Sequence, residues 1–291
     1  MSMVQVPGTD GQFLATQKMY SPNDSGEARI QIVTPKGKGD WEVRTLAKLP
    51  YVHRFDIVEK NGVSYLIACT LKSGHKYKDD WTTPGKVYTA ALPEDLRGFN
   101  EENQLELEVI RDGLSRNHGY YKMENSGGPA CVISADQGVF LFTPPKEADG
   151  RWEIEQLLDT PASDGVLVDM DGDGKPELAV IAPFHGDNIS IYKKESGSYK
   201  KVYDYHKPAE FAHSIYGGML CGKPGVVIGH RKGSRDLLAF TYNKETERYE
   251  VQVMDEDCGS ANVLRYINHG RDVIISANRE INEIAMYILE P

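Results

Sequence analysis

The stretch Asp169-Met-Asp-Gly-Asp-Gly-Lys-Pro-Glu-Leu-Ala-Val-Ile-Ala-Pro-Phe-His185 joins an acidic turn to an apolar run that ends on a polar tip. The apolar run, Ala179–His185, is one of six that share a pattern: aliphatic residues, one small residue, and a polar or charged end. The other five are Phe13–Lys18, Leu66–Lys72, Cys131–Gln137, Val226–Lys232 and Val273–Arg279. A pattern that recurs in this way indicates a repeat architecture.

The spacing of the runs is nearly constant in the second half of the chain. Measured between their small residues, the steps from Ser134 to Ala182, Gly229 and Ser276 are 48, 47 and 47 residues. The two earlier steps are longer, at 53 and 66 residues, and the longer of them contains two insertions, within 74–84 and 94–103. The sequence therefore contains one structural unit in six copies.

Each unit contains segments with the period of a β-strand. An alternating segment such as Leu237–Tyr242 follows the apolar run, and an outer segment such as Trp152–Leu157 alternates apolar and charged residues. A shorter strand opening on a polar residue precedes the run in all units but the first. Four strands in each unit of this size form the blade of a β-propeller. The sequence predicts an all-β, six-bladed β-propeller, with five or seven blades as alternatives.

We interpret residues 1–291 as a single propeller domain. The predicted blades are approximately 1–50, 51–113, 114–161, 162–209, 210–258 and 259–291. Two readings remain for the chain ends: residues 1–8 supply a short inner strand of the first blade and leave the last blade three-stranded, or Met3–Val6 completes the last blade as a closing strap.

The acidic turn has the spacing of a calcium-binding loop. Carboxylates at Asp169, Asp171, Asp173 and Glu177, with the backbone carbonyl of Lys175, would present the oxygen ligands that a hard cation requires. The turn resembles the FG-GAP or VCBS-type propeller repeat, whose blades carry Asp-x-Asp-x-Asp-Gly followed by an acidic residue and Leu. That resemblance covers one blade of six and implies a structural Ca²⁺; the alternative is a solvated turn without metal. By strand alternation the loop lies on the opposite rim from the polar strand tips.

Polar residues recur at equivalent positions of the repeats, where a propeller would bring them toward its central channel. Inner-strand starts supply His53, His118, Asp164, His213 and Asn262, and second-strand tips supply Lys18, Lys72, Asp136, His185, His230, Arg231, Lys232 and Arg279.

Two chemistries fit these residues. The imidazoles of His53, His118 and His213, or of His185 and His230, could hold Zn²⁺ or Mn²⁺. Alternatively, His53, His118, His185, His213, His230 and Lys72 act as acids and bases beside Arg231 and Arg279, which would bind a carboxylate or stabilise an enolate. The second set suits proton abstraction and β-elimination from a sugar.

Other residues of this rim could contact a ligand. The aromatic residues Tyr51, Tyr120, Tyr121, Phe184 and Tyr216 either stack on sugar rings or pack in the walls. The insertion Lys72–Gly85, with His75, Lys76, Tyr77 and Trp81, is either a lid or a surface flap.

Two functions follow from these features. The first is a carbohydrate-active lyase or dehydratase/isomerase, and we favour an enzyme because histidine, lysine and arginine gather on one rim. The blade pattern resembles the propellers of aldos-2-ulose dehydratases and of some polysaccharide lyases, although no catalytic motif matches residue by residue. The alternative is a non-catalytic module that binds a sugar or a protein. For the enzyme and for a sugar-binding module, the partner is a small-molecule or oligosaccharide ligand.

Composition excludes some other classes. A net charge of -10 argues against nucleic-acid binding, which needs a clustered basic face. No apolar run has the length of a membrane span, and the N-terminus lacks a basic region followed by an apolar stretch. Four cysteines without a Cys-x-x-Cys pair favour free thiols over disulfides or zinc. We expect a cytoplasmic protein, with a mature secreted form as the alternative; the sequence leaves the oligomeric state open.

Overall fold

The computed structural model describes residues 2–125, 128–147 and 149–290. Within these ranges the regular elements are strands, apart from one turn of 3-10 helix, η1 (Arg279–Ile281). None of the described residues forms a helix long and apolar enough to cross a membrane. The prediction of an all-β chain is confirmed.

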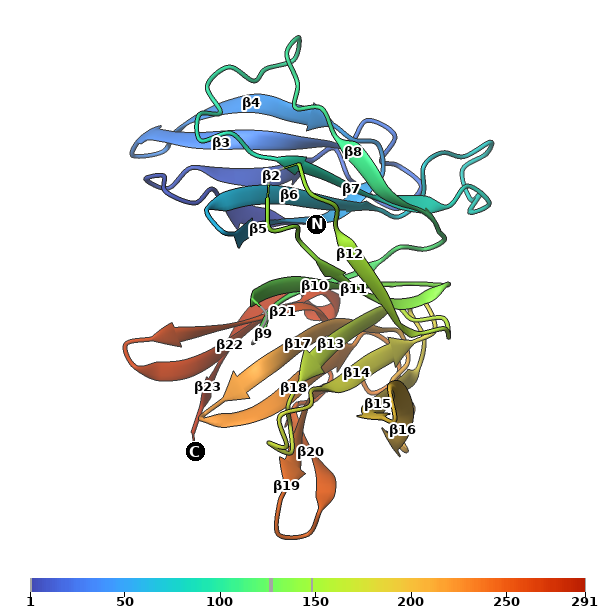
Figure 1. The fold of residues 1–291 in the computed structure, drawn as a ribbon. Coiled ribbons are helices and arrows are strands. Elements are labelled where there is room, and N and C mark those ends of the chain that lie inside the picture. The colour runs from blue at the N-terminus through green and yellow to red at the C-terminus, as the bar shows by residue number, and fades with distance from the viewer. Residues whose placement is uncertain (1, 126–127, 148, 291) are drawn as a thin grey trace. The chain divides into compact units, whose positions relative to one another are not determined.

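The strands of the described residues form six sheets, each built from consecutive strands (Figure 1). The first contains β1 (Met3–Gln5), β2 (Phe13–Gln17), β3 (Arg29–Gly37) and β4 (Asp40–Lys48). The second contains β5 (Val52–Lys60), β6 (Val63–Thr70), β7 (Gly85–Ala91) and β8 (Glu108–Leu114). The third contains β9 (Gly119–Asn125), β10 (Gly128–Ala135), β11 (Gly138–Thr143) and β12 (Glu153–Leu158).

The remaining three sheets repeat this plan. The fourth contains β13 (Asp164–Val168), β14 (Glu177–Ala182), β15 (Asn188–Glu195) and β16 (Ser198–Asp204). The fifth contains β17 (Ala212–Leu220), β18 (Lys223–His230), β19 (Leu237–Asn243) and β20 (Arg248–Asp255). The sixth has three strands, β21 (Ser260–Asn268), β22 (Arg271–Asn278) and β23 (Glu283–Leu289). These sheets are the blades of a six-bladed β-propeller, as the sequence predicts.

The N-terminal strand belongs to the first blade. β1 pairs antiparallel with β2, and Met3 lies opposite Ala15. The last blade is left with three strands, so the first reading of the chain ends is correct. The reading in which Met3–Val6 completes the last blade is wrong.

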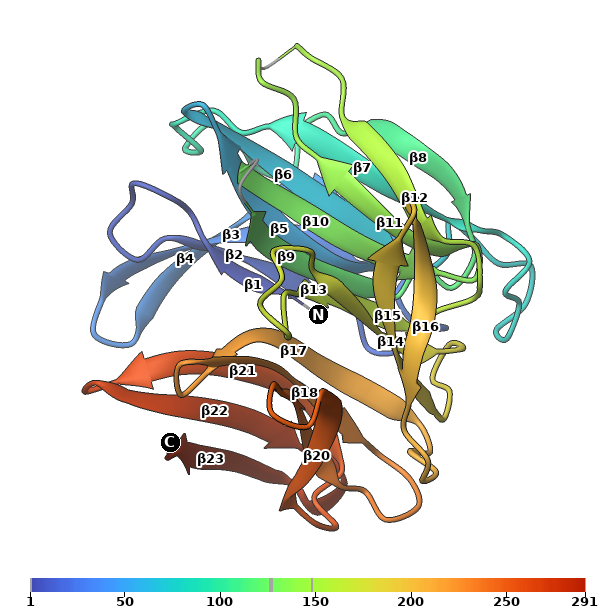
Figure 2. The ribbon, with the colours of Figure 1, turned by 60° about the horizontal axis from the view of Figure 1, so that its bottom comes forward.

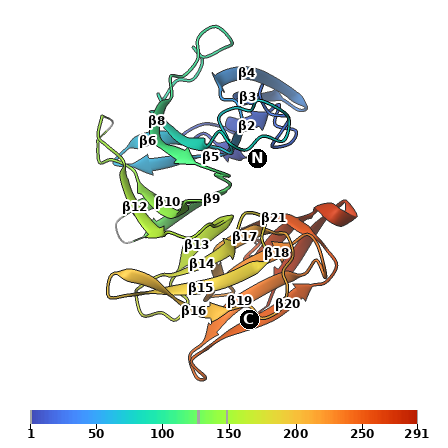
Figure 3. The same cartoon turned by 90° about the vertical axis from the view of Figure 1, so that its right-hand side faces the viewer.

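The chain divides into two compact units of three blades each. In the N-terminal unit, Met1–Gln156, the inner strand β5 lies against β1 and β9 (Figure 2). In the C-terminal unit, Leu157–Pro291, the inner strand β17 lies against β13 and β21 (Figure 3). Within each unit the first strands of successive blades are therefore neighbours.

Burial follows the strand order within a blade. The second strands carry continuous apolar runs, and Ala179–Ile181 of β14 and Val226–Ile228 of β18 are almost wholly buried. The outer strands β16 and β20 alternate, and they leave Val202 and Val253 about 40% exposed. A strand with pairing on both edges and packing on both faces reads as continuously apolar, whereas an edge strand needs one polar face.

Strand β14 separates the two features that the opening stretch joins in sequence. The acidic turn precedes its first residue, Glu177, and His185 follows its last residue, Ala182. Since the strand is extended, the turn and the histidine lie at opposite ends of the blade, as strand alternation predicts.

Candidate functional site

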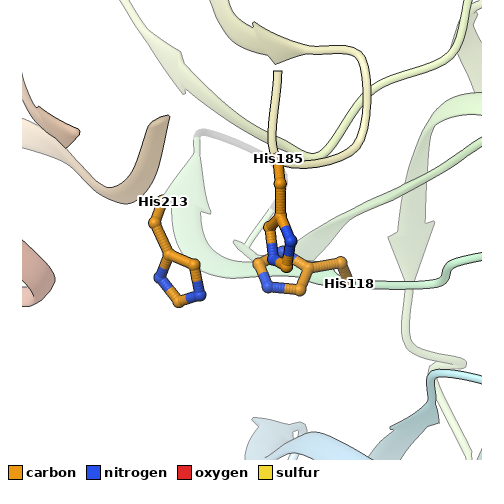
Figure 4. A group of neighbouring side chains, drawn as sticks. All are labelled: His118, His185 and His213. Atoms are coloured by element: carbon orange, nitrogen blue, oxygen red, sulfur yellow. The ribbon is translucent and has the colours of Figure 1, made fainter. Parts of the chain in front are cut away.

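The candidate site of the C-terminal unit is built around two stacked imidazoles. Figure 4 shows His118, His185 and His213; the last two belong to this unit, and their ring centroids lie 5.2 Å apart at an interplanar angle of 29°. His185 follows β14 in a left-handed backbone conformation, with φ of 49°, and His213 is the second residue of β17. Neighbouring blades of the unit thus contribute one histidine each.

His185 lies between two aromatic side chains. Its ring centroid is 3.9 Å from that of Phe184 and 4.4 Å from that of Phe211. This burial, with a smaller effect of the positive charge of Arg231, lowers the pKa of His185 to about 4. The imidazole is therefore neutral at neutral pH, the form in which it accepts a proton or a metal ion.

A backbone contact fixes the tautomer of His213. Its Nδ1 lies 2.9 Å from the carbonyl oxygen of Ala261, and a carbonyl only accepts hydrogen bonds. Nδ1 therefore carries the proton, and in the neutral ring Nε2 has the lone pair. A carbonyl that accepts from one ring nitrogen orients the other ring nitrogen for proton transfer or for binding a metal ion.

Two cations flank Phe211. The guanidinium of Arg231 lies 4.7 Å from its ring centroid, and the ammonium of Lys232 lies 5.4 Å from it. Arg231 also donates from Nε and Nη2 to Oε1 of Glu280, at 2.8 and 2.6 Å. We call His185, His213, Phe184, Phe211 and Arg231 the imidazole cluster. It combines the neutral imidazole of His185, a second imidazole of fixed tautomer and a cation, which suits proton abstraction from carbon beside an anionic group.

His230, also predicted for this rim, holds a loop. It is fully buried, its Nδ1 lies 2.9 Å from the carbonyl oxygen of Lys232, and its Nε2 accepts from the backbone N–H of Asp236 at 3.1 Å. Both ring nitrogens are thus used to close residues 230–236. Arg279 lies exposed in η1.

The N-terminal unit has a histidine pair of its own. His53 of β5 and His118, which precedes β9, are 8% and 2% exposed, and their ring centroids lie 4.6 Å apart. Nδ1 of His53 lies 3.3 Å from the carbonyl oxygen of His118. Both histidines are therefore part of the packing between the second and third blades.

Lys72 anchors the insertion that follows β6. Its side chain is fully buried, and its ammonium donates to Oδ1 of Asn23 at 2.8 Å and to the carbonyl oxygen of Asp80 at 3.0 Å. The ammonium also lies 4.9 Å from the ring centroid of Trp81, and burial lowers its pKa. These contacts give Lys72 a structural role in fixing the base of the insertion.

The tip of the insertion is exposed, and its base is fixed. His75, Lys76 and Tyr77 are exposed. Asp80 accepts from the backbone N–H groups of Lys76 and Thr82 at 2.9 and 2.8 Å, which holds the turn in place.

The predicted aromatic residues have different surroundings. Phe184 belongs to the imidazole cluster. The ring centroid of Tyr51 lies 5.5 Å from the ammonium of Lys72. The hydroxyl of Tyr120 lies 3.2 Å from Sγ of Cys131. All four cysteines, which lie in the described part of the chain, are free thiols outside any disulfide bond.

The acidic turn is closed by its own carboxylates. Oδ2 of Asp169 accepts from the backbone N–H of Gly174 at 3.0 Å, and Oε2 of Glu177 accepts from that of Met170 at 2.7 Å. Asp171 and Asp173 accept from the N–H groups two residues ahead, those of Asp173 and Lys175.

The remaining oxygens of the turn fit a hard cation. Ligand atoms of Asp169, Asp171 and Glu177 lie within 4.8 Å of one another. Oδ1 of Asp169 and Oε1 of Glu177 are buried, and neither has a hydrogen-bond partner within the described part of the chain. Buried oxygens are normally satisfied, and converging carboxylates are the ligands that Ca²⁺ takes in proteins. Asp169, Asp171 and Glu177 would hold the ion, with Asp173 beside them.

Sequence reasoning missed three residues near these sites. Phe211 lies between His185 and Arg231, Glu280 binds Arg231, and Lys193 reaches into the acidic turn from β15. Phe211 precedes His213 by two residues, so an aromatic residue beside a predicted site histidine was the available signal. Glu280 and Lys193 lie 49 and 22 residues from their partners, and no local pattern links them.

Comparisons with known proteins agree with this architecture. A periplasmic gluconolactonase of Pseudomonas aeruginosa has a TM-score of 0.61 at 12% identity, with 99% of this chain and 81% of that chain covered. A putative 6-phosphogluconolactonase of Bacteroides fragilis has a TM-score of 0.60 at 11% identity, with 99% and 80% covered. The leech intramolecular trans-sialidase has a TM-score of 0.57 at 8% identity, with 98% and 67% covered.

At these identities the likeness concerns the fold alone. No curated protein sequence matches the chain. Residues 161–198 match the model of the FG-GAP repeat, and they contain the acidic turn, β14 and β15. This segment is therefore an FG-GAP repeat, as the sequence predicts, within a chain that has the fold of a β-propeller.

Proposed function

We propose that this chain is a carbohydrate-active enzyme that removes a proton from a sugar and expels a leaving group, as a lyase or a dehydratase/isomerase does. The observation that carries this proposal is the imidazole cluster, where a neutral histidine stacks on a second histidine of fixed tautomer. The gluconolactonases and the trans-sialidase named above are propellers whose names refer to carbohydrate substrates, which supports the substrate class.

His185 is the proposed base, and its low pKa is suited to an acidic substrate. In the free protein, burial and Arg231 oppose its protonation. A uronic-acid carboxylate bound by Arg231, which also holds Glu280, would add a negative charge near the imidazole and raise its pKa toward the working pH, since an opposite charge nearby favours the charged form of a base. Substrate binding would thereby activate the base.

His213 and Arg231 complete the proposed reaction. The base takes the proton beside the carboxylate, and the electron pair forms a carbon–carbon double bond as the C–O bond to the leaving group breaks. His213 donates a proton to the leaving oxygen in its protonated form, and Arg231 stabilises the enolate charge that develops on the carboxylate.

A panel of uronic-acid oligosaccharides tests this proposal, with ultraviolet absorbance reporting the unsaturated product. His185→Ala, His213→Ala and Arg231→Met are each expected to lower kcat/KM by about a hundredfold or more, the usual effect of removing an acid–base or charge-stabilising group. His269→Ala, at an exposed turn, is the control. Turnover that survives all three cluster substitutions would refute the assignment.

Non-catalytic sugar binding is the second candidate, and a different surface favours it. Tyr203, Tyr242 and Tyr249 line a pocket of about 400 Å³ beside the acidic turn. Aromatic faces with a few polar groups suit a sugar ring. Sugar binding without turnover, abolished by Tyr249→Ala and retained in His185→Ala, would favour this function over the enzyme.

We also propose that the acidic turn binds a structural Ca²⁺, and the support is that Oδ1 of Asp169 and Oε1 of Glu177 are buried and have no hydrogen-bond partner among the described residues. Elemental analysis and calorimetric titration test it. The transition-metal site of His53, His118 and His213, the cytoplasmic location and the exclusion of nucleic acid stay predictions from the sequence.

A further inference from the structure

The acidic turn contains a cation that belongs to the chain itself. Lys193 of β15 forms an ion pair with Asp171, and its ammonium lies 3.0 Å from Oδ2 of Asp173 and 3.6 Å from Oε1 of Glu177. The lysine side chain is 25% exposed, and that of Glu177 is fully buried. The ammonium is therefore held among oxygens that would bind Ca²⁺.

One ammonium does not satisfy this site. Asp169, Asp171, Asp173 and Glu177 carry four carboxylates, and within the described residues Lys193 forms its ion pairs with Asp171, Asp173 and Glu177. Oδ1 of Asp169 and Oε1 of Glu177 have no hydrogen bond among the described residues, although both are buried. A divalent cation coordinates several oxygens at once and would satisfy both. The geometry therefore favours Ca²⁺ over lysine as the more complete occupant.

The two cations cannot share the site. Ca²⁺ coordinated by Asp171 and Glu177 would lie next to the ammonium that contacts the same carboxylates, and like charges at this separation repel strongly where water is partly excluded. Calcium binding therefore requires Lys193 to move.

A space beside the turn can receive the displaced side chain. Asp171 and Lys193 line the tyrosine pocket of about 400 Å³, together with Tyr203, Tyr242 and Tyr249. The ring centroid of Tyr249 lies 5.5 Å from that of Tyr203 and 5.1 Å from that of Tyr242. Aromatic faces attract an ammonium, and Glu247 offsets the charge of Arg248 in the same lining, so the pocket offers Lys193 a second position.

We propose that Lys193 and Ca²⁺ are alternative occupants of the acidic turn, and that calcium binds by displacing the ammonium toward the tyrosine pocket. This inference rests on the calcium site proposed above. In the absence of metal, Lys193 offsets the repulsion among the carboxylates and keeps the turn folded. In the presence of metal, the displacement of Lys193 weakens calcium binding compared with a site that lacks the lysine.

The test compares calcium titration of the full chain with that of Lys193→Met by calorimetry. Removal of the competing cation is expected to tighten calcium binding by about tenfold or more, since each tenfold step corresponds to ~1.4 kcal/mol. Lys194→Met is the matched control, because Lys194 is the next residue of β15 and its ammonium lies over Tyr199 at 5.8 Å. Lys193→Gln serves as a second variant if the methionine variant does not fold.

Thermal unfolding in chelator and in calcium supplies a second readout. The wild-type Tm is expected to change little on chelation, whereas Lys193→Met melts lower in chelator and recovers in calcium. Equal calcium affinity of wild type and Lys193→Met would overturn the exchange and leave the calcium site standing. Absence of calcium binding in both proteins would overturn the calcium site as well.

Discussion

Substitution of His185 by leucine should make the protein less sensitive to mild acid. The pKa of His185 is lowered to about 4 in the folded protein, first by burial and then by the charge of Arg231. An exposed histidine in the unfolded chain has a pKa of about 6.5. Between these values the unfolded state binds more protons, so the contribution of His185 is fully present above pH of about 6.5 and is lost as the pH falls through about 4.

The size of the effect on stability follows from the pKa of His185 in the folded protein and in the unfolded chain. At pH of about 4.5 the wild type should have lost about 2 to 3 kcal/mol of unfolding free energy through His185 alone. Leucine keeps the apolar contacts with Phe184 and Phe211 and cannot be protonated. The difference in stability between pH of about 7.5 and 4.5 should therefore be smaller in the variant by roughly that amount.

Urea unfolding at the two pH values measures this difference, and NMR titration of labelled histidine gives the pKa directly. Carboxylates that titrate in the same range contribute equally to wild type and variant, so they cancel in the comparison. His269→Leu, at an exposed turn, should behave as wild type. If wild type and His185→Leu lose the same stability on acidification, His185 is not held neutral, and its proposed role as a neutral base loses its support.

Three further predictions follow from other contacts. Lys72→Ala should lower the unfolding free energy by about 3 kcal/mol, because it removes a buried ammonium together with its two hydrogen bonds. Urea unfolding measures this loss, and Lys76→Ala on the exposed tip should change the unfolding free energy little. Gly229→Ala places a Cβ 2.5 Å from Cβ of Ser260 and should lower the unfolding free energy by about 1 to 3 kcal/mol. In Gly26→Ala the nearest neighbour of the new Cβ is the Tyr51 hydroxyl at 3.6 Å, so the loss should be much smaller. Equal decreases in Tm for the two variants would contradict the packing argument. Burial raises the pKa of Cys131 to about 12, so iodoacetamide should modify the half-buried Cys221 first, and mass spectrometry showing early labelling of Cys131 would refute this.

The functional residues divide according to what surrounds them. The rim histidines occur at equivalent repeat positions, so the sequence pattern does not distinguish the role of one from that of another. In the structure, His230 uses both ring nitrogens to hold a loop, while His213 has one nitrogen fixed by a carbonyl and stacks beside His185. The difference arises from contacts with residues far from each histidine in sequence, such as Ala261 and Arg231.

The sequence by itself determined the class of fold and favoured six blades over the alternatives of five or seven. Runs such as Ala179–Ile181 and Val226–Ile228 are apolar throughout because the second strand of a blade is packed on both faces, and this requirement is local and repeats with every blade. The acidic turn was equally readable, because its carboxylates bind backbone groups within a few residues.

Only the tertiary structure decided the roles of single side chains. Whether Lys72 contacts solvent or Asn23, and whether the carboxylates of the turn face water or Lys193, depends on residues 49 and 22 positions away. Such contacts form when separate strands pack together, and they leave no periodic signal in the chain. For that reason the sequence did not indicate that Lys193 pairs with the carboxylates of the acidic turn, and only the folded protein shows this contact.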